Sequence, residues 1–142
     1  MTFRVFLVDY NAKAPTKGSQ YAAGHDLYAS EQVIIPARTR KLVNTGIILQ
    51  VDREDCYLRV APRSGLSVKG IDIGAGVVDY DYRGKVKVLM INNSESDFTV
   101  DIGDRIAQLI VERIYTDDFI DSPIDAMLDT SRGVGGFGST GK

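Results

Sequence analysis

Residues 85–92 read Lys-Val-Lys-Val-Leu-Met-Ile-Asn and carry the clearest signal of fold class in the chain. Charged and apolar residues alternate over the first half of this stretch, and residues 88–91 are continuously apolar. This pattern predicts a β-strand that passes from a half-exposed to a buried position. Four further segments are rich in β-branched and aromatic residues and are bounded by turn residues, which predicts more strands: 3–8, 32–35, 40–50 and 56–61.

Residues 105–114 (RIAQLIVERI) have a spacing that fits either a helix or a strand, and their β-branched content favours a strand. Turn residues gather at Asp55, at 92–94 and at 101–104. Strands at this spacing predict an all-β sandwich or barrel. The expected exception is a short helical turn that begins near Ser64.

The composition agrees with one β-rich domain. The chain has 142 residues, enough for one domain of ordinary size, and 15 Asp against 4 Glu. Asp favours caps and turns, whereas Glu favours helix interiors. A formal net charge of -2 offers no strongly basic surface for nucleic acid. The longest purely apolar run, residues 88–91, is too short to span a membrane, so no membrane partner is expected.

Cys56 is the only cysteine, so no internal disulfide can form. Together with the lack of a long apolar segment near the N-terminus, this favours an intracellular location, cytoplasmic or nuclear. The sequence Asn92-Asn93-Ser94 fits a glycosylation sequon. In an intracellular protein we expect that match to be chance.

The periodicity is lost from Asp117 onward, and the chain ends in a glycine-rich segment, RGVGGFGSTGK. We therefore expect a core of residues 1–116 and a C-terminal arm of residues 117–142. The glycines would let backbone amides approach an anion, and Phe137 would be free to cover a flat ligand such as a nucleobase. A disordered tail explains the same composition equally well.

Residues 79–84 (DYDYRG) place two carboxylates, two tyrosines and a glycine between apolar segments. They could present a general base beside a ring that packs on a sugar. A simple hairpin tip is the more economical interpretation. The preceding residues 74–79 lack the third glycine of a dinucleotide fingerprint, and no βαβ unit surrounds them.

Three further positions could carry chemistry. Arg63 and Ser64 stand at the start of the expected helical turn, where a phosphate could bind, although a Pro-Gly turn with Ser64 as N-cap fits as well. Gln108 would share a strand face with apolar residues, and a buried amide needs partners. His25 precedes Asp26, but adjacent strand residues point to opposite faces, so a surface histidine is favoured over a catalytic pair.

Five segments, taken in order, resemble the five motifs of the trimeric dUTP diphosphatase (dUTPase) family: AGHDL (23–27), PRSGL (62–66), GVVDYDYRG (76–84), GDRIAQLI (103–110) and RGVGGFGSTG (132–141). The resemblance implies a jelly-roll-like distorted β-barrel and a homotrimer with active sites shared between subunits. It implies hydrolysis of dUTP to dUMP and pyrophosphate, with Mg²⁺ on the triphosphate. Such an activity limits uracil in DNA and supplies dUMP for thymidylate synthesis.

The resemblance also implies residue roles. Asp79 is similar to the carboxylate that activates the attacking water, and Tyr82 to the ring that packs on deoxyribose and excludes a 2′-hydroxyl. Asp26 matches the aspartate associated, through water, with the metal. Gly76 and Val77 belong to the segment that resembles the uracil slot. Phosphate contacts are implied for Arg63, Ser64, Gly65 and Gln108, and a mobile closing arm for Arg132, Phe137, Gly138, Ser139 and Thr140.

Two alternatives remain. The nearest alternative is a dCTP deaminase, which shares the fold that the resemblance implies, but those enzymes look to use a glutamate on the strand after the third motif. Residues 85–93 contain neither Glu nor Asp. A catalytically silent nucleotide-binding or scaffold trimer would be expected to lose Asp79 or the arm, and both are present.

Overall fold

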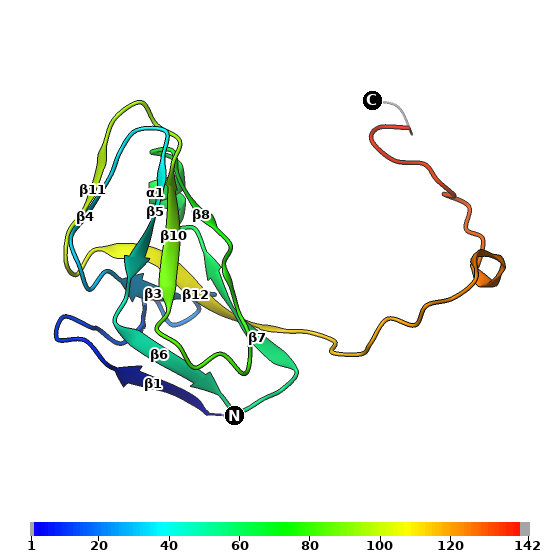
Figure 1. Cartoon of the computed structure of the whole chain (residues 1–142), viewed down its shortest axis with the longest axis horizontal. Helices are drawn as coiled ribbons and strands as arrows, with labels where there is room; N and C mark the ends of the chain where they lie inside the picture. Colours follow the sequence, from blue (N-terminus) through cyan, green and yellow to red (C-terminus); the bar gives the residue numbers. More distant parts are fainter. Residues whose placement is uncertain (1, 140–142) are drawn as a thin grey trace.

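A computed structural model describes residues 2–139 and is shown in Figure 1. Apart from short helices, its regular elements are strands, which confirms the all-β prediction. The elements are β1 (Phe3–Leu7), β2 (Thr16–Lys17), β3 (His25–Tyr28), β4 (Val33–Ile35), β5 (Arg40–Asn44), β6 (Ile47–Val51), β7 (Cys56–Ala61), α1 (Ser64–Ser67), β8 (Ile71–Gly74), β9 (Val77–Val78), β10 (Lys87–Asn92), β11 (Phe98–Val100), β12 (Arg105–Arg113) and the 3-10 helix η1 (Ile124–Ala126).

The strands pair antiparallel in four ladders. The largest has the order β2-β3-β12-β7-β9, and a second has the order β5-β10-β8. The pairs β1-β6 and β11-β4 complete the set. Within residues 2–139 the ladders stay separate and do not close into one hydrogen-bonded barrel, so the barrel detail of the prediction is not confirmed.

The core lies between these ladders and is filled mainly by alternate residues of the longer strands, whereas β1 and β2 contribute no buried residue. On β10, Val88, Met90 and Asn92 are fully buried, whereas Leu89 and Ile91 are half-buried. The apolar run at 88–91 is therefore an alternating strand, and β10 lies between its paired neighbours β5 and β8. The strand starts at Lys87, two residues after the predicted start.

One predicted strand is wrong as a single element. Residues 40–50 form β5 and β6, with a break at Thr45-Gly46. Gly46 has a φ of 68°, which favours glycine, and an added Cβ would lie 2.9 Å from the Cβ of Ala12. The chain turns there, and the Thr45 hydroxyl donates to the carbonyl of Val86 at 2.6 Å. The predicted strands at 56–61 and 105–114 are confirmed to within a residue.

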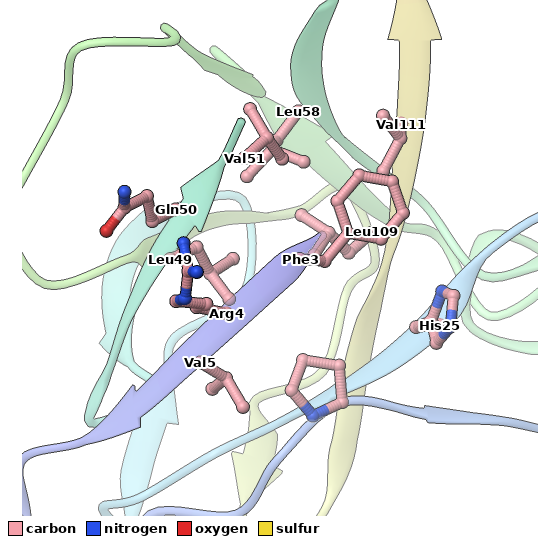
Figure 2. A pocket seen from close by; sticks show the side chains of 11 residues that line it. Phe3, Arg4, Val5, His25, Leu49, Gln50, Val51, Leu58, Leu109 and Val111 are labelled. Carbon is pink, nitrogen blue, oxygen red and sulfur yellow. The ribbon is translucent and has the colours of Figure 1, made fainter. Parts of the chain in front are cut away.

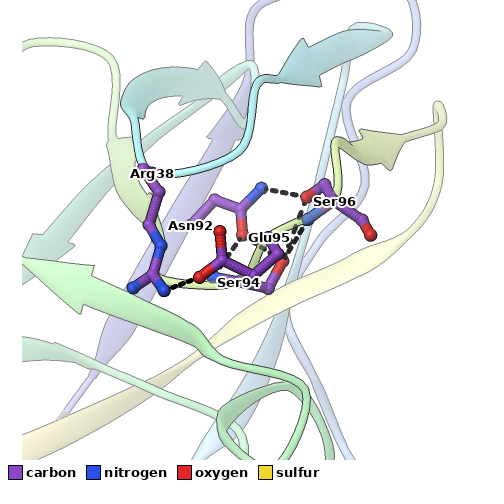
Figure 3. A network of polar contacts seen from close by, with 5 residues as sticks. All are labelled: Arg38, Asn92, Ser94, Glu95 and Ser96. Carbon is purple, nitrogen blue, oxygen red and sulfur yellow. Dashed lines mark hydrogen bonds and ion pairs between the residues drawn. The ribbon is translucent and has the colours of Figure 1, made fainter.

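A buried asparagine secures the loop that follows β10 (Figure 3). The side-chain amide of Asn92 donates to the carbonyls of Ile35 at 3.0 Å and Ser96 at 2.8 Å, and its oxygen accepts from the backbone of Ser94 at 3.0 Å. On the outside of this loop Arg38 pairs with Glu95. The side-chain hydrogen bonds of Asn92 all stabilise the fold, so the loop structure accounts for the asparagine of the sequon.

The chain leaves the sheets after β12 (Figure 1). The amide of Ile114 still donates to the carbonyl of Asp55 at 2.9 Å, and residues 115–134 are exposed. Several large apolar side chains of this arm face solvent, among them Phe119, Ile120 and Leu128. No helix within the described part of the chain is long and apolar enough to cross a membrane.

Candidate active site

The centre of strand β12 brings three of the five segments together. Gln108 lies opposite Asp26 on β3 and opposite Ala61 on β7, because β12 pairs with both strands. The Gln108 amide donates to the carbonyl of Pro62 at 2.8 Å. The expected partner for this amide is thus a backbone carbonyl next to Arg63. Hydrogen-bond register fixes the spacing of this group of residues.

Asp26 is enclosed by two arginines. The Arg63 Nε donates to its Oδ1 at 3.0 Å, and the Arg105 Nη1 lies 3.6 Å from its Oδ2. Arg63 also donates from Nη1 to the carbonyl of Arg105 at 3.1 Å. Charge-assisted bonds of this kind orient a guanidinium strongly. Arg63 is therefore held in place before any ligand binds. Arg105 carries no sequence-predicted role, although it lies within the fourth segment.

The short helix α1 follows directly. Its N-cap residue is Arg63, in an extended conformation, and no side chain caps the helix. The interpretation of Ser64 as an N-cap is therefore wrong. Ser64 and Gly65 are exposed at the first two helical positions. Next to α1 is a cleft of about 360 Å³ whose charged lining residues are Arg63, Lys69, Arg105 and Asp104, so three cations and one carboxylate border it.

The third segment forms a narrow slot against β7. The amide of Val60 donates to the carbonyl of Gly76 at 2.8 Å, and Val77 pairs with Arg59. Gly76 has a φ of 87°, and an added Cβ would lie 2.6 Å from the carbonyl oxygen of Val60. Only glycine fits this position. A cleft of about 120 Å³ opens here, lined by residues 74–78 of the segment together with Leu42, Val60, Lys87 and Leu89.

Asp79 and Tyr82 follow the slot in one turn. The amide of Tyr82 donates to the carbonyl of Asp79 at 3.1 Å, and the Tyr82 hydroxyl donates to the carbonyl of Lys85 at 3.1 Å. The Asp79 side chain is exposed, and the Tyr82 residue is 45% exposed. The turn therefore presents a carboxylate and an aromatic ring to solvent, as the hairpin interpretation and the base-and-ring interpretation both require.

The hairpin that contains Asp79 and Tyr82 lies at one end of β7. The cluster of Asp26, Arg63, Arg105 and Gln108, called the Arg63 group from here on, lies at the other end. Strand β9 runs antiparallel to β7, with Val78 beside Leu58, so Asp79 follows toward the start of β7. Arg63 comes after the other end of the same strand. Six residues of extended chain, from the level of Tyr57 to Arg63, span about 20 Å. One copy of the chain therefore keeps Asp79 and Arg63 apart.

Within residues 132–139, the hydrogen bonds of the glycine-rich end of the arm are all local. The Arg132 Nε donates to the carbonyl of Gly135 at 2.7 Å, and the amide of Ser139 donates to the carbonyl of Gly136 at 3.0 Å. Phe137 is fully exposed, and Gly138 has a φ of 85°. Thr140 lies outside the described residues. The roles expected of these arm residues stay predictions.

His25 lies apart from the arginines that surround Asp26. Figure 2 shows its ring at the edge of an apolar cleft of about 170 Å³ between β1 and β12, near Phe3 and Leu109. Asp26, the next residue, is engaged with the arginines on another side of β3. This arrangement supports the prediction that the two do not act as a pair. Residues 2–139 contain no group of three His, Cys, Asp or Glu side chains that could hold a metal.

Shifted pKa values occur near the start of β7 and the end of β12. The Tyr57 hydroxyl donates to Glu112 at 2.6 Å, which raises the pKa of Tyr57 and lowers the pKa of Glu112. The hydrogen bonds from Arg53 lower the pKa of Asp55, and Arg113 at 3.1 Å adds to the effect. These pairs, most of whose members are partly buried, join neighbouring strands and turns.

Comparison with known proteins identifies the family. The family model described as dUTPase matches residues 10–141. The deoxyuridine 5'-triphosphate nucleotidohydrolase of Yarrowia lipolytica is 53% identical over 142 residues, which covers 99% of this chain and 90% of the relative. The protein of the same name from Rabbitpox virus is 52% identical over 130 residues and covers 92% of this chain and 86% of its own length.

Solved structures agree on the fold. A point mutant of the Staphylococcus bacteriophage 80alpha dUTPase, determined with dUpNHpp, superposes with a TM-score of 0.90 at 22% identity, over 99% of both chains. A point mutant of the dUTPase from phage phi11 of S. aureus, described with a structural Mg(II) ion, gives 0.81 at 20% identity, over 92% of this chain and all of that one. The match of a family model to nearly the whole length, and relatives at 52–53% identity, show that the chain belongs to the dUTPase family.

Proposed function

We propose that the chain hydrolyses dUTP to dUMP and pyrophosphate by in-line attack of a water on the α-phosphorus, with Asp79 as the base that activates this water. The observation that carries the proposal is the 53% identity, over nearly the full length of both chains, to a deoxyuridine 5'-triphosphate nucleotidohydrolase. The chemistry of the candidate site supports it. By this activity the protein would limit uracil in DNA and supply dUMP for thymidylate synthesis, within the cytoplasm or nucleus.

The triphosphate would bind at the start of α1. Arg63 supplies a cation that Asp26 and the carbonyl of Arg105 already orient. Ser64 and Gly65 are exposed beside it and offer a hydroxyl and backbone amides, and Gln108 lies next to Pro62. Phosphoryl transfer asks mainly for positioning and charge neutralisation, so an arginine fixed in advance is well suited to it.

The base would enter the slot formed by Gly76 and Val77. The backbone there stands close to β7, and hydrogen-bonding groups of the main chain would read the edge of uracil. A slot of this kind rejects other bases because a mismatched base leaves buried polar groups unpaired. Tyr82 follows in the same hairpin, where its ring would pack on deoxyribose and leave no room for a 2′-hydroxyl.

Asp79 is the proposed general base. Its carboxylate is exposed on the hairpin, a few residues from the proposed base slot, and is free to contact a water. A positioned base of this kind contributes a rate factor of about 10²–10⁴. The other groups named here bind and orient the substrate, so most of the remaining acceleration would come from positioning and charge.

The complete site would need more than one copy of the chain. The hairpin with Asp79 and the group around Arg63 lie about 20 Å apart along β7. A homotrimer would join the hairpin of one subunit to the Arg63 group of another. Exposed apolar side chains along β1, such as Val5, Phe6 and Leu7, support burial against further copies.

Mg²⁺ would enter with the substrate. Both oxygens of the Asp26 carboxylate face arginines, and the described residues offer no three-residue metal cluster. Mg²⁺ commonly keeps several waters and binds substrate phosphates with little direct protein ligation. The site therefore fits a triphosphate that carries its own Mg²⁺, with Asp26 at most in contact with the water shell. The bound ion would neutralise phosphate charge.

The arm would close the site. In the part that the structure describes, the hydrogen bonds of its glycine-rich end are local, and Phe137, Gly138 and Ser139 are exposed. Ordering over the nucleotide would cover uracil with Phe137 and bring Arg132, Ser139 and Thr140 to the phosphates. Closure of this kind excludes water and then allows product release.

Pyrophosphate release tests the proposal directly. We expect rapid release from dUTP in the presence of Mg²⁺, and slow release from UTP, dTTP and dCTP or after chelation of the metal. Ammonia release from dCTP would instead favour the deaminase alternative. Binding of dUTP without any pyrophosphate release would favour a silent nucleotide-binding trimer.

A further inference from the structure

Gly84 lies against the ring of Tyr82, which precedes it by two residues in the hairpin. An added Cβ at Gly84 would lie 3.0 Å from the Tyr82 Cε2 and still closer to its Cζ and hydroxyl oxygen. Real Cβ atoms do not come this close, so any side chain at position 84 would displace the phenol. Gly84 itself has a φ outside the left-handed region. The backbone would therefore accept another residue here, and the constraint comes from the ring.

The ring is fixed at its far end by one peptide group. The Tyr82 hydroxyl donates to the carbonyl of Lys85 at 3.1 Å, and the N–H of that same peptide, from Val86, donates to the carbonyl of Ile47 at 2.9 Å. Val86 is 1% exposed, and its own carbonyl accepts from the Thr45 hydroxyl at 2.6 Å. The peptide that carries the acceptor of the phenol is thus hydrogen-bonded to β6 and adjoins a core residue.

The backbone of Tyr82 is hydrogen-bonded to the backbone of the proposed base, Asp79. The amide of Tyr82 donates to the carbonyl of Asp79 at 3.1 Å, which closes the turn between them. The Lys85 side chain forms an ion pair with Asp9, which adds a second anchor behind the hairpin. The position of the aromatic ring relative to Asp79 is therefore fixed. The exposed part of the ring faces solvent, where a sugar would pack.

We propose that Gly84 is a positioning residue for sugar discrimination. Because it has no side chain, the Tyr82 hydroxyl reaches the core-anchored carbonyl of Lys85, and the ring is held where a 2′-hydroxyl would collide with it. A side chain at position 84 breaks that bond, and the ring can then move aside and leave space for the 2′-hydroxyl of a ribose. The inference rests on the proposed function, since it concerns the choice between dUTP and UTP.

The test is Gly84→Ala, with Gly18→Ala as the matched control. An added Cβ at Gly18 meets no atom within 4 Å, and Gly18 is outside the proposed site. We expect the ratio of kcat/KM for dUTP to that for UTP to fall about 10-fold or more in Gly84→Ala, because a misplacement of about 1 Å can cost about 10²-fold. The control should keep the wild-type ratio, and both variants should keep the wild-type unfolding midpoint closely.

Two further variants separate positioning from a merely structural role. Tyr82→Phe keeps the ring but loses the bond to Lys85, so its ratio should fall as well. In a Tyr82→Ala background, Gly84→Ala should have no further effect on the ratio. A wild-type ratio in Gly84→Ala, or an equal loss of ratio with and without the Tyr82 ring, would overturn the inference. Absence of dUTP hydrolysis in the wild-type protein would overturn the proposed function instead.

Discussion

The Nε of Arg63 donates to the Oδ1 of Asp26 at 3.0 Å and thereby joins β3 to the segment that follows β7, the other strand that flanks β12. Only 15% of the Asp26 side chain is exposed, and its second oxygen faces Arg105. This carboxylate neutralises two cations that would otherwise repel each other. The orientation of Arg63 thus depends on a residue that need not touch substrate.

Asp26→Asn should therefore raise KM for dUTP more than it lowers kcat. The amide cannot neutralise Arg63 and Arg105, and the free energy of unfolding should fall by about 1.5–3 kcal/mol, the range for a hydrogen bond to a charged group. Steady-state kinetics and denaturant titration measure both effects. Asp118→Asn, at an exposed position in the arm, is the control. A normal KM in Asp26→Asn would show that Arg63 is oriented without it.

Asp79→Asn should lower kcat by about 10²-fold or more, because the amide cannot take a proton from water. The substitution nearly conserves shape, and the exposed position makes a loss of stability small. The control is Asp81→Asn, two residues further along the same exposed turn. Pyrophosphate release under saturating dUTP gives the comparison. Near-normal turnover in Asp79→Asn would remove this residue as the base.

Deletion of residues 132–142 should leave the unfolding midpoint and the oligomeric state unchanged while most dUTP hydrolysis is lost. The described part of this segment contributes no side chain to the core, so the sheets do not depend on it. Circular dichroism, sedimentation and the pyrophosphate assay measure the three quantities. Full activity in the truncated protein would contradict a closing role for the arm.

The pKa of Asp55 predicts an acid-sensitive contact. Hydrogen bonds from Arg53 hold this pKa below its ordinary value of 3.8, so the carboxylate stabilises the fold above that value. The contribution is lost as pH falls through the lowered pKa and Asp55 takes up a proton. Unfolding midpoints of the wild type and Asp55→Asn should differ at neutral pH and converge in acid. A constant difference would show that the charge of Asp55 is not responsible.

Long alternating segments gave the fold class, and short ones did not. The β-branched content at 56–61 and 105–114 is enough to favour a strand, although the spacing at 105–114 also fits a helix. In contrast, β2, β8, β9 and β11 have only two to four residues and show no period. The break at Gly46 depends on a positive φ that the sequence does not display. Local pattern is a weak guide wherever distant segments set the backbone.

The candidate site also contains residues that the sequence could predict and residues that it could not. Asp79, Tyr82 and Arg63 stand in segments whose order resembles a family, so candidate roles could be assigned to them. The partners that hold them could not be, because they come from elsewhere in the chain. Arg105 reaches Asp26 through strand pairing, and Gly84 matters only once the ring of Tyr82 is seen against it.

The separation of Asp79 from Arg63 along β7 has a genetic consequence. If each active site takes its hairpin from one chain and its Arg63 group from another, a variant at Asp79 and a variant at Arg63 inactivate different halves of the site. Dissociated and reassembled together, the two inactive variants would form some sites from two intact halves. Two loss-of-function alleles of this single gene should then complement each other in one cell.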